Sequence, residues 1–187
     1  MGAAPGLDLA RRRRGLDDRL VTLITPRSTP QFVVVRDIEA PQSVVFDVIT
    51  SEAGMRAWIP LCRSVEWRHP PGRTAPAAGS VRYIVLAGGL IAAERLIDWD
   101  EGRELQYTFD RSSIPLAAVT TNYVGATRLE SEGASRTRLI WSIYFDTPGW
   151  QGLLAPVLRL NLRGLIGLMA GKVRKIAQHE IAKTKEY

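Results

Sequence analysis

Hydrophobic and polar residues alternate along most of the chain between residues 32 and 146. Strict alternation is typical of an antiparallel sheet that buries only one of its faces. In the run "RTRLIWSIYFD", one face collects Thr137, Leu139, Trp141, Ile143 and Phe145. With turn residues as boundaries, the pattern predicts seven strands, at 32–40, 62–69, 80–87, 90–99, 103–110, 117–130 and 136–146.

Three other stretches have the spacing of amphipathic helices. "PQSVVFDVIT" and "EAGMRAWIP" predict two short helices after the first strand, and the second of them ends at Pro60. From Pro148 onward the chain is predicted to be helical almost to its end, with an apolar stripe formed by Leu154, Leu158, Leu162, Leu165, Met169, Val173 and Ile176. Sheet and last helix each have one apolar face. We therefore predict an α+β domain whose curved antiparallel seven-stranded sheet wraps around the long C-terminal helix.

The order of these elements resembles a known superfamily. "PQSVVFDVITSEAGMRAWIP", "IDWDEGRELQYTF" and "GASRTRLIWSIYFDTPG" look like the START-like, Bet v 1-like (SRPBCC) superfamily, over residues 31–184. Within it, the chain is most similar to the polyketide cyclase/dehydrase and lipid-transport group. "WIPLCRSVEW" is also similar to the related coenzyme Q-binding proteins. The resemblance implies a helix-grip fold with a deep cavity between sheet and helix, of a kind that holds small hydrophobic ligands.

The resemblance also implies which side chains form the wall of that cavity. The expected ligand-binding residues are Trp58, Trp99, Tyr107, Phe109, Tyr123, Trp141, Leu158, Leu165 and Met169. The alternative is that these residues only pack the core, which is the commoner role of an aromatic stripe.

A charged side chain is predicted to face the same cavity. If Ile97 and Trp99 point inward, strand alternation turns Arg95 inward as well, where it needs a carboxylate or a ligand oxygen. Cyclases and aromatases of the resembled family use cavity Arg and Tyr residues to polarise a carbonyl, which makes Arg95 and Tyr83 the catalytic candidates. The alternative is that a β-bulge exposes Arg95 and turns Glu94 inward, or that Arg95 pairs with a structural carboxylate.

No pattern for a metal or a cofactor is present. The chain has two histidines, His69 and His179, far apart and without cysteine neighbours, so we predict neither metal nor cofactor. Cys62 is the single cysteine, which excludes an intramolecular disulfide and suits a reducing cytoplasm. No histidine near it in sequence would activate the thiol, so Cys62 is expected to be a small buried side chain.

The net charge of +6 is concentrated at the two ends of the chain. Residues 1–30 contain six Arg and three Asp, and residues 148–187 contain seven Lys or Arg and two Glu, whereas 31–147 contain twelve Arg and fourteen acidic residues. Nucleic-acid binders usually spread basic and aromatic residues over a folded face, so no nucleic acid is predicted as a partner. Basic ends suit peripheral contact with an anionic membrane, and the alternative is that they are solvated helix faces and a loose arm.

The length of 187 residues suits one domain with an extra arm. We predict a flexible basic arm at 1–30 and a ligand-binding domain at 31–187, in a cytoplasmic protein that is a monomer or a homodimer. Asp17 and Asp18 interrupt the apolar run that a secretory signal would need. Gly164, Gly167 and Gly171 interrupt the last helix, either for close backbone approach or to soften it.

These features lead to three hypotheses about function. The first is binding of a hydrophobic small molecule, such as a polyketide, an isoprenoid or quinone, or a lipid, in the internal cavity. The second is a polyketide aromatase/cyclase or dehydratase that uses cavity Arg and Tyr side chains for acid-base chemistry without a cofactor. The third is a peripheral membrane adaptor that works through the two basic ends.

Overall fold

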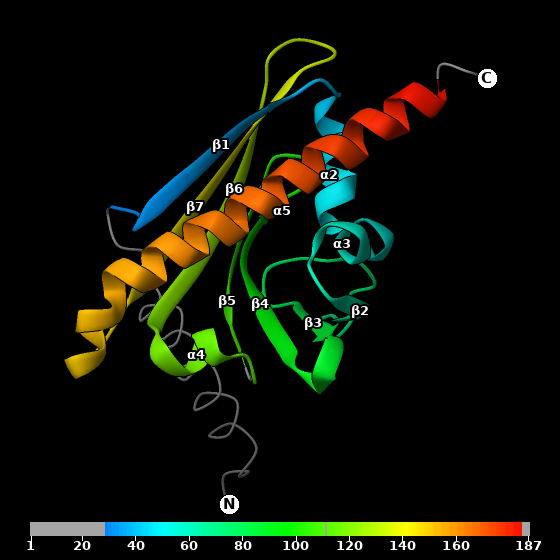
Figure 1. Ribbon diagram of the computed structural model, residues 1–187. Coiled ribbons are helices and arrows are strands. Elements are labelled where there is room, and N and C mark those ends of the chain that lie inside the picture. Colours follow the sequence, from blue (N-terminus) through cyan, green and yellow to red (C-terminus); the bar gives the residue numbers. More distant parts are fainter. Residues whose placement is uncertain (1–28, 111, 185–187) are drawn as a thin grey trace, which may run out of the picture.

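The computed structural model of the protein describes residues 29–110 and 112–184 (Figure 1). The predicted arm, residues 1–30, lies outside the described residues except for its last two positions. The described strands form one antiparallel sheet in the order β1-β7-β6-β5-β4-β3-β2, which confirms the predicted sheet. The strands are β1 (Phe32–Ile38), β2 (Cys62–Arg68), β3 (Val81–Leu86), β4 (Ile91–Asp100), β5 (Glu104–Phe109), β6 (Thr121–Ser131) and β7 (Thr137–Asp146).

The helices lie on one face of this curved sheet. Two short helices, α2 (Gln42–Thr50) and α3 (Glu52–Trp58), follow β1 as predicted. The long helix α5 (Ala155–Thr184), preceded by the 3-10 turn η2 (Gly149–Leu154), crosses the sheet with α2 and α3 beside it (Figure 1). This is the helix-grip arrangement that the element order implies, and it leaves room between α5 and the curved sheet.

One predicted strand begins too early. The stretch predicted as strand 117–130 contains instead the end of a short helix, α4 (Pro115–Val119), and β6 starts only at Thr121. Pro115 occupies the first turn of α4, where the missing N–H of proline is not needed. A second short element, the 3-10 turn η1 (Ala87–Gly89), connects β3 to β4. Because the sheet is antiparallel, η1, α4 and η2 all lie at the same end of it.

The buried stripe of α5 is rotated relative to the predicted one. The helix buries Leu162, Ile166, Ala170, Val173 and Ala177 against the sheet. Of the predicted stripe, Leu162 and Val173 are buried, whereas Leu154 and Leu165 are 48% and 43% exposed. The small side chains of Ala170 and Ala177 bring the helix close to the sheet, and this contact selects the face that turns inward.

A β-bulge in β4 reverses the inside and outside of the strand. The pairing with β5 shifts between Leu96 and Asp98, so the residues before the shift that face the helix are Ala92, Glu94 and Leu96. The prediction that Arg95 faces inward is therefore wrong. Its side chain is 47% exposed and forms an ion pair with Asp110 at 2.9 Å. One extra residue in a strand inverts the facing of every side chain beyond it. The structure therefore agrees with the alternative prediction, in which a β-bulge exposes Arg95 and turns Glu94 inward.

Tyr83 also lies on the outer face of the sheet. In β3 the buried positions are Val81, Arg82 and Ile84, and the ring of Tyr83 is covered instead by the guanidinium of Arg68, 4.6 Å from the ring centroid. Neither of the two predicted catalytic residues therefore points toward α5.

Candidate functional site between sheet and C-terminal helix

A cavity of about 120 Å³ lies between the sheet and α5. The strands β3, β4, β5, β6 and β7 form one side of its wall. The end of α3, the segment that includes α4 and the first half of α5 form the rest. The lining residues are Trp58, Ile59, Arg82, Ile84, Leu86, Ala92, Glu94, Tyr107, Phe109, Ile114, Leu116, Tyr123, Trp141, Leu162, Leu165, Ile166 and Met169. The wall is therefore mainly apolar, with two charged side chains and two phenols.

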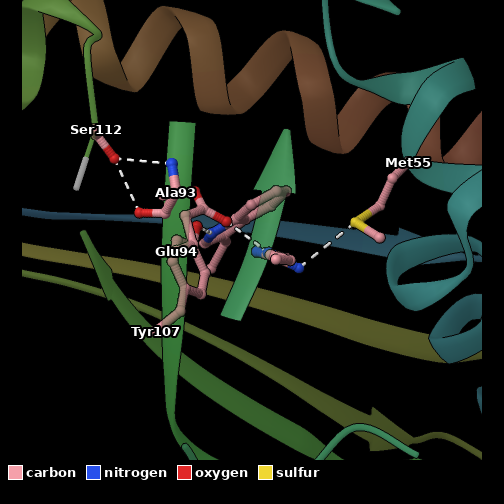
Figure 2. A network of polar contacts seen from close by, with 7 residues as sticks. Met55, Ala93, Glu94, Tyr107 and Ser112 are labelled. Atoms are coloured by element: carbon pink, nitrogen blue, oxygen red, sulfur yellow. Dashed lines mark hydrogen bonds and ion pairs between the residues drawn. The ribbon is translucent and has the colours of Figure 1, made fainter. Parts of the chain in front are cut away.

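The two charged side chains form a buried ion pair across neighbouring strands. Arg82 of β3 and Glu94 of β4 are direct partners in the strand register, and Arg82 Nε donates to Glu94 Oε2 at 2.5 Å. Their side chains are 2% and 11% exposed. Arg82 Nη1 also contacts Met55 Sδ at 3.7 Å, and the guanidinium lies 4.7 Å from the centroid of the Tyr107 ring. Figure 2 shows Glu94 and Tyr107 on the sheet, with Met55 reaching in from α3.

The protein uses only part of the hydrogen-bonding capacity of this pair. A guanidinium has five N–H donors and a carboxylate has about four acceptor positions. Among the described residues, no acceptor lies on Arg82 Nη2 and no donor lies on Glu94 Oε1. Neither atom is fully enclosed by protein, because neither is among the fully buried polar atoms without a partner. The pair therefore leaves Arg82 Nη2 and Glu94 Oε1 without a protein partner, and both residues line the cavity.

The two cavity tyrosines remain protonated over the physiological pH range. Burial raises the pKa of the Tyr107 phenol, and the negative charge of Glu94 raises it further. Burial likewise raises the pKa of Tyr123, with added contributions from Tyr107 and Glu94. The indole N–H of Trp141 donates to the Tyr107 hydroxyl at 3.2 Å and fixes its position. The Tyr123 hydroxyl donates to the Tyr107 hydroxyl, so Tyr107 is the phenol whose proton is left for a ligand. Neither phenol can act as a base at neutral pH.

A glycine in β6 makes room for the ring of Tyr107. Gly125 lies directly opposite Tyr107 in the strand register. A Cβ atom at Gly125 would lie 2.3 Å from Tyr107 Cζ, so any side chain there would displace the ring. The glycine therefore positions Tyr107 beneath Arg82 and beside Trp141.

The apolar part of the wall lies between the ion pair and one end of the sheet. Ile84 and Leu86 follow Arg82 toward the end of β3, and Ala92 precedes Glu94 near the start of β4. Phe109 stacks on Tyr123 with ring centroids 4.1 Å apart. Ser112 holds the chain after β5 to this place, because its hydroxyl bonds both backbone groups of Ala93 (Figure 2). The cavity is thus polar at its inner end and apolar toward α4.

Most residues predicted to form the wall lie in it. The cavity is lined by Trp58, Tyr107, Phe109, Tyr123, Trp141, Leu165 and Met169. Trp99 and Leu158 are not among the lining residues. The Trp99 ring packs edge-on against Phe46 and Trp67 on the far side of the bulge, and Leu158 packs against the core at the start of α5. A ligand-binding role for the predicted residues stays a prediction.

Sequence reasoning missed Arg82 at the polar end and gave an inward Glu94 only as the alternative to Arg95. Arg82 and Glu94 each interrupt an apolar face, Arg82 in the same parity as Ile84 and Leu86, and Glu94 in the same parity as Ala92 and Leu96. A charge of each sign on two consecutive strands is a signal for a cross-strand pair. It was obscured because the position of the bulge is not visible in the sequence.

Other reactive side chains do not converge on this cavity. Cys62 is half-buried and its thiol contacts the Ser64 carbonyl oxygen at 3.6 Å, while burial raises its pKa and the nearby Arg56 only partly offsets this. Within residues 29–110 and 112–184, no group of three or more His, Cys, Asp or Glu side chains is arranged to hold a metal ion.

Solved structures share this fold at low sequence identity. A START superfamily protein from Mycobacterium smegmatis aligns with a TM-score of 0.62 at 9% identity, over 79% of this chain and 97% of that one. The Zhui aromatase/cyclase from Streptomyces sp. R1128 aligns with a TM-score of 0.53 at 19% identity, over 78% and 94%. Norcoclaurine synthase from Thalictrum flavum, solved with dopamine and hydroxybenzaldehyde, aligns with a TM-score of 0.59 at 13% identity, over 79% and 86%.

Sequence comparison identifies a family but no individual relative. No curated protein matches the chain in sequence. The family described as polyketide cyclase / dehydrase and lipid transport matches residues 29–178, which include every strand, α2 to α4 and most of α5. On this match, the chain belongs to the polyketide cyclase/dehydrase and lipid-transport family, and its helix-grip fold is shared with a START superfamily protein.

Proposed function

We propose that the protein binds a hydrophobic small molecule that carries a carbonyl or hydroxyl oxygen, in the cavity between the sheet and α5. The observation that carries this proposal is the Arg82–Glu94 pair. Its free donor and acceptor belong to residues that line a cavity whose remaining wall is almost entirely apolar. A ligand oxygen at Arg82 Nη2 would give this buried guanidinium a partner that the described protein groups leave open.

The size of the cavity limits what fits without movement. Small-molecule sites usually enclose roughly 300–1,000 Å³, whereas this cavity measures about 120 Å³. A polyketide, quinone or acyl chain therefore requires α4 or the first half of α5 to shift outward. Leu165 lines the cavity and is also 43% exposed, so the opening lies between α5 and α4.

A pair of matched ligands tests the proposal directly. Binding of 2-acetylnaphthalene and of 2-ethylnaphthalene is measured by displacement of a fluorescent hydrophobic probe from the full chain. The two ligands have nearly the same shape, but only the first carries a carbonyl oxygen. We expect the ketone to bind at least about tenfold more tightly, because a hydrogen bond to a charged donor contributes about 1.5–3 kcal/mol.

The control uses the second ion pair of β4. Arg82→Met combined with Glu94→Gln should remove the preference for the ketone, whereas Arg95→Met combined with Asp110→Asn on the outer face should retain it. Equal affinity of the wild-type protein for both ligands would overturn the assignment of the polar end. Native mass spectrometry of the freshly purified protein, followed by extraction, would identify a bound natural ligand.

The same geometry supports cyclisation as a second candidate function. Glu94 Oε1 can accept a proton from the carbon next to a ligand carbonyl, while Arg82 holds the resulting enolate oxygen. The enolate carbon then attacks a second carbonyl of the same chain, whose oxygen takes the proton back from Glu94. Incubation with a poly-β-keto thioester tests this step. Turnover that Glu94→Gln abolishes supports it, and tight binding without turnover leaves the protein a carrier.

A further inference from the structure

The outer face of η2 and of the first half of α5 is apolar although it points away from the sheet. Trp150, Leu153 and Leu160 are 73%, 83% and 73% exposed, and Val157 and Leu168 are also largely exposed. The positions 153, 157, 160, 164 and 168 are spaced by three or four residues, so they form one stripe. This stripe lies opposite the buried residues Leu162, Ile166 and Ala170. We call it the outer apolar stripe.

The helix is consequently apolar on two sides. In the described part of the chain, Gly152–Lys183 is the one helical stretch that is long and apolar enough to cross a membrane. Its most apolar window of 18 residues has a mean hydropathy of 1.4, yet only 17% of that window is buried. Helices that are hydrophobic all round are normally covered on all sides. The sheet covers one side of α5 here, and nothing in the described chain covers the other.

Positive charge continues the outer apolar stripe toward the C-terminus. After Leu168, the same helical spacing leads to Lys172 and Lys175. Between residues 147 and 179 the chain contains five Lys or Arg and no Asp or Glu. Within the described residues none of Arg163, Lys172 and Lys175 lies in an ion pair. The face therefore combines exposed apolar side chains with basic side chains that no carboxylate neutralises.

The apolar surface extends around the end of the sheet. Leu61 directly precedes β2, Leu90 directly precedes β4, and η2 follows β7. The antiparallel register places these three points at the same end of the sheet. Leu61 is 74% exposed, and Leu90 is exposed as well. The rim at the apolar end of the cavity and the start of the outer apolar stripe thus lie at the same end of the sheet, where Figure 1 shows α4 and the first turns of α5.

We infer that this face docks peripherally on a lipid bilayer that contains anionic headgroups. Trp150, Leu153 and Leu160 enter the interface between headgroups and acyl chains, and the lysines that follow contact lipid phosphates. Charge decides between the possible occupants. A second copy of the chain would bring the same unneutralised Lys and Arg residues together, whereas an anionic bilayer is complementary to them. The inference does not depend on which ligand the cavity holds.

Co-sedimentation of the full chain with vesicles tests the inference. The vesicles contain either phosphatidylcholine alone or phosphatidylcholine mixed with phosphatidylglycerol. We expect binding to the mixed vesicles that weakens as salt is added, and much weaker binding to the neutral ones. Leu153→Ser combined with Leu160→Ser, and separately Lys172→Gln combined with Lys175→Gln, should each lower the partition coefficient by about tenfold or more.

The matched control is Val35→Ser, an exposed apolar side chain on β1. It should bind vesicles like the wild type, and unchanged thermal unfolding should show that all variants fold. The inference is overturned if both double variants bind like the wild type, because binding would then come from elsewhere, such as the Arg-rich residues 11–14. The inference is also overturned if the wild-type protein binds no vesicles and the double leucine variant converts a wild-type dimer into a monomer.

Discussion

Arg82 and Glu94 are the only charged residues that the described chain buries. Removing two charges from water costs several kcal/mol per ion, and only good geometry with further hydrogen bonds offsets the cost. Here the pair has one short hydrogen bond, the Met55 sulfur and the Tyr107 ring, and part of its capacity is left for the cavity. A buried ion pair that lacks some of its hydrogen-bond partners in the protein contributes little to the free energy of unfolding. Its position is the observation on which the proposed ligand site rests.

The cost of removing one partner can be measured. Arg82→Met should lower the free energy of unfolding by about 3–5 kcal/mol, because it leaves the Glu94 carboxylate buried without its partner. Arg95→Met removes a similar ion pair from the outer face and should change it by less than about 1 kcal/mol. Denaturant unfolding of both variants provides the comparison. Equal losses would show that the Arg82 environment is more hydrated than its burial indicates.

At the scale of single elements, α5 has more glycine than its packing needs. A Cβ at Gly164 or Gly171 would meet no atom within 4 Å, and at Gly167 the nearest would be Arg36 Nη2 at 3.6 Å. Close backbone approach therefore does not explain these glycines. A softened helix next to the cavity opening does, because a ligand larger than about 120 Å³ requires α5 or α4 to move.

The softness of α5 can be removed without changing its packing. Gly164→Ala and Gly171→Ala should each stabilise the protein by up to about 1 kcal/mol, because alanine in a helix interior is favoured over glycine by that amount. If the helix must bend to admit a ligand, the combined variant should also bind the naphthalene ketone more slowly. Thermal unfolding and stopped-flow displacement measure the two effects. Faster ligand entry in the stabilised variant would contradict a role for helix bending.

At the scale of the whole molecule, the buried phenols should make the free energy of unfolding fall as the pH rises in the alkaline range. Above about pH 10 the unfolded chain loses its phenol protons, whereas the native state keeps those of Tyr107 and Tyr123, whose pKa values are raised. The native state then binds more protons than the unfolded one, so stability falls as pH rises. The contribution of the two protonated phenols to the free energy of unfolding is fully present below pH 10 and is lost progressively above it.

Tyr107→Phe separates this effect from general alkaline unfolding. The variant should lose stability less steeply than the wild type as the pH rises above about 10, whatever its stability at neutral pH. Urea unfolding at a series of pH values gives the two slopes. In the native wild type, phenolate absorbance should develop for the accessible tyrosines before Tyr107 and Tyr123 ionise. Identical slopes would mean that Tyr107 is reached by solvent.

The sequence by itself determined the seven strands, the two short helices after the first strand, the long last helix and their order, although not the short helix α4. The alternation in β7 and the three-to-four spacing around Val45 and Ile49 are local periodicities, and each depends only on neighbouring residues. The charge pattern, with basic residues at the two ends of the chain, is equally a property of the sequence. The family could be recognised for the same reason, because its motifs follow the order of these elements.

Only the tertiary structure decided which side chains share the cavity. The bulge between Leu96 and Asp98 depends on how β4 pairs with β5, and it exchanges the places of Glu94 and Arg95. The stripe of α5 that is buried depends likewise on contact with the sheet, which favours the small Ala170 and leaves Leu165 at the surface. In both elements, the sequence would allow more than one face to turn toward the core. The choice between them is made by long-range packing, since a shift of one residue inverts a strand and a modest rotation turns a helix.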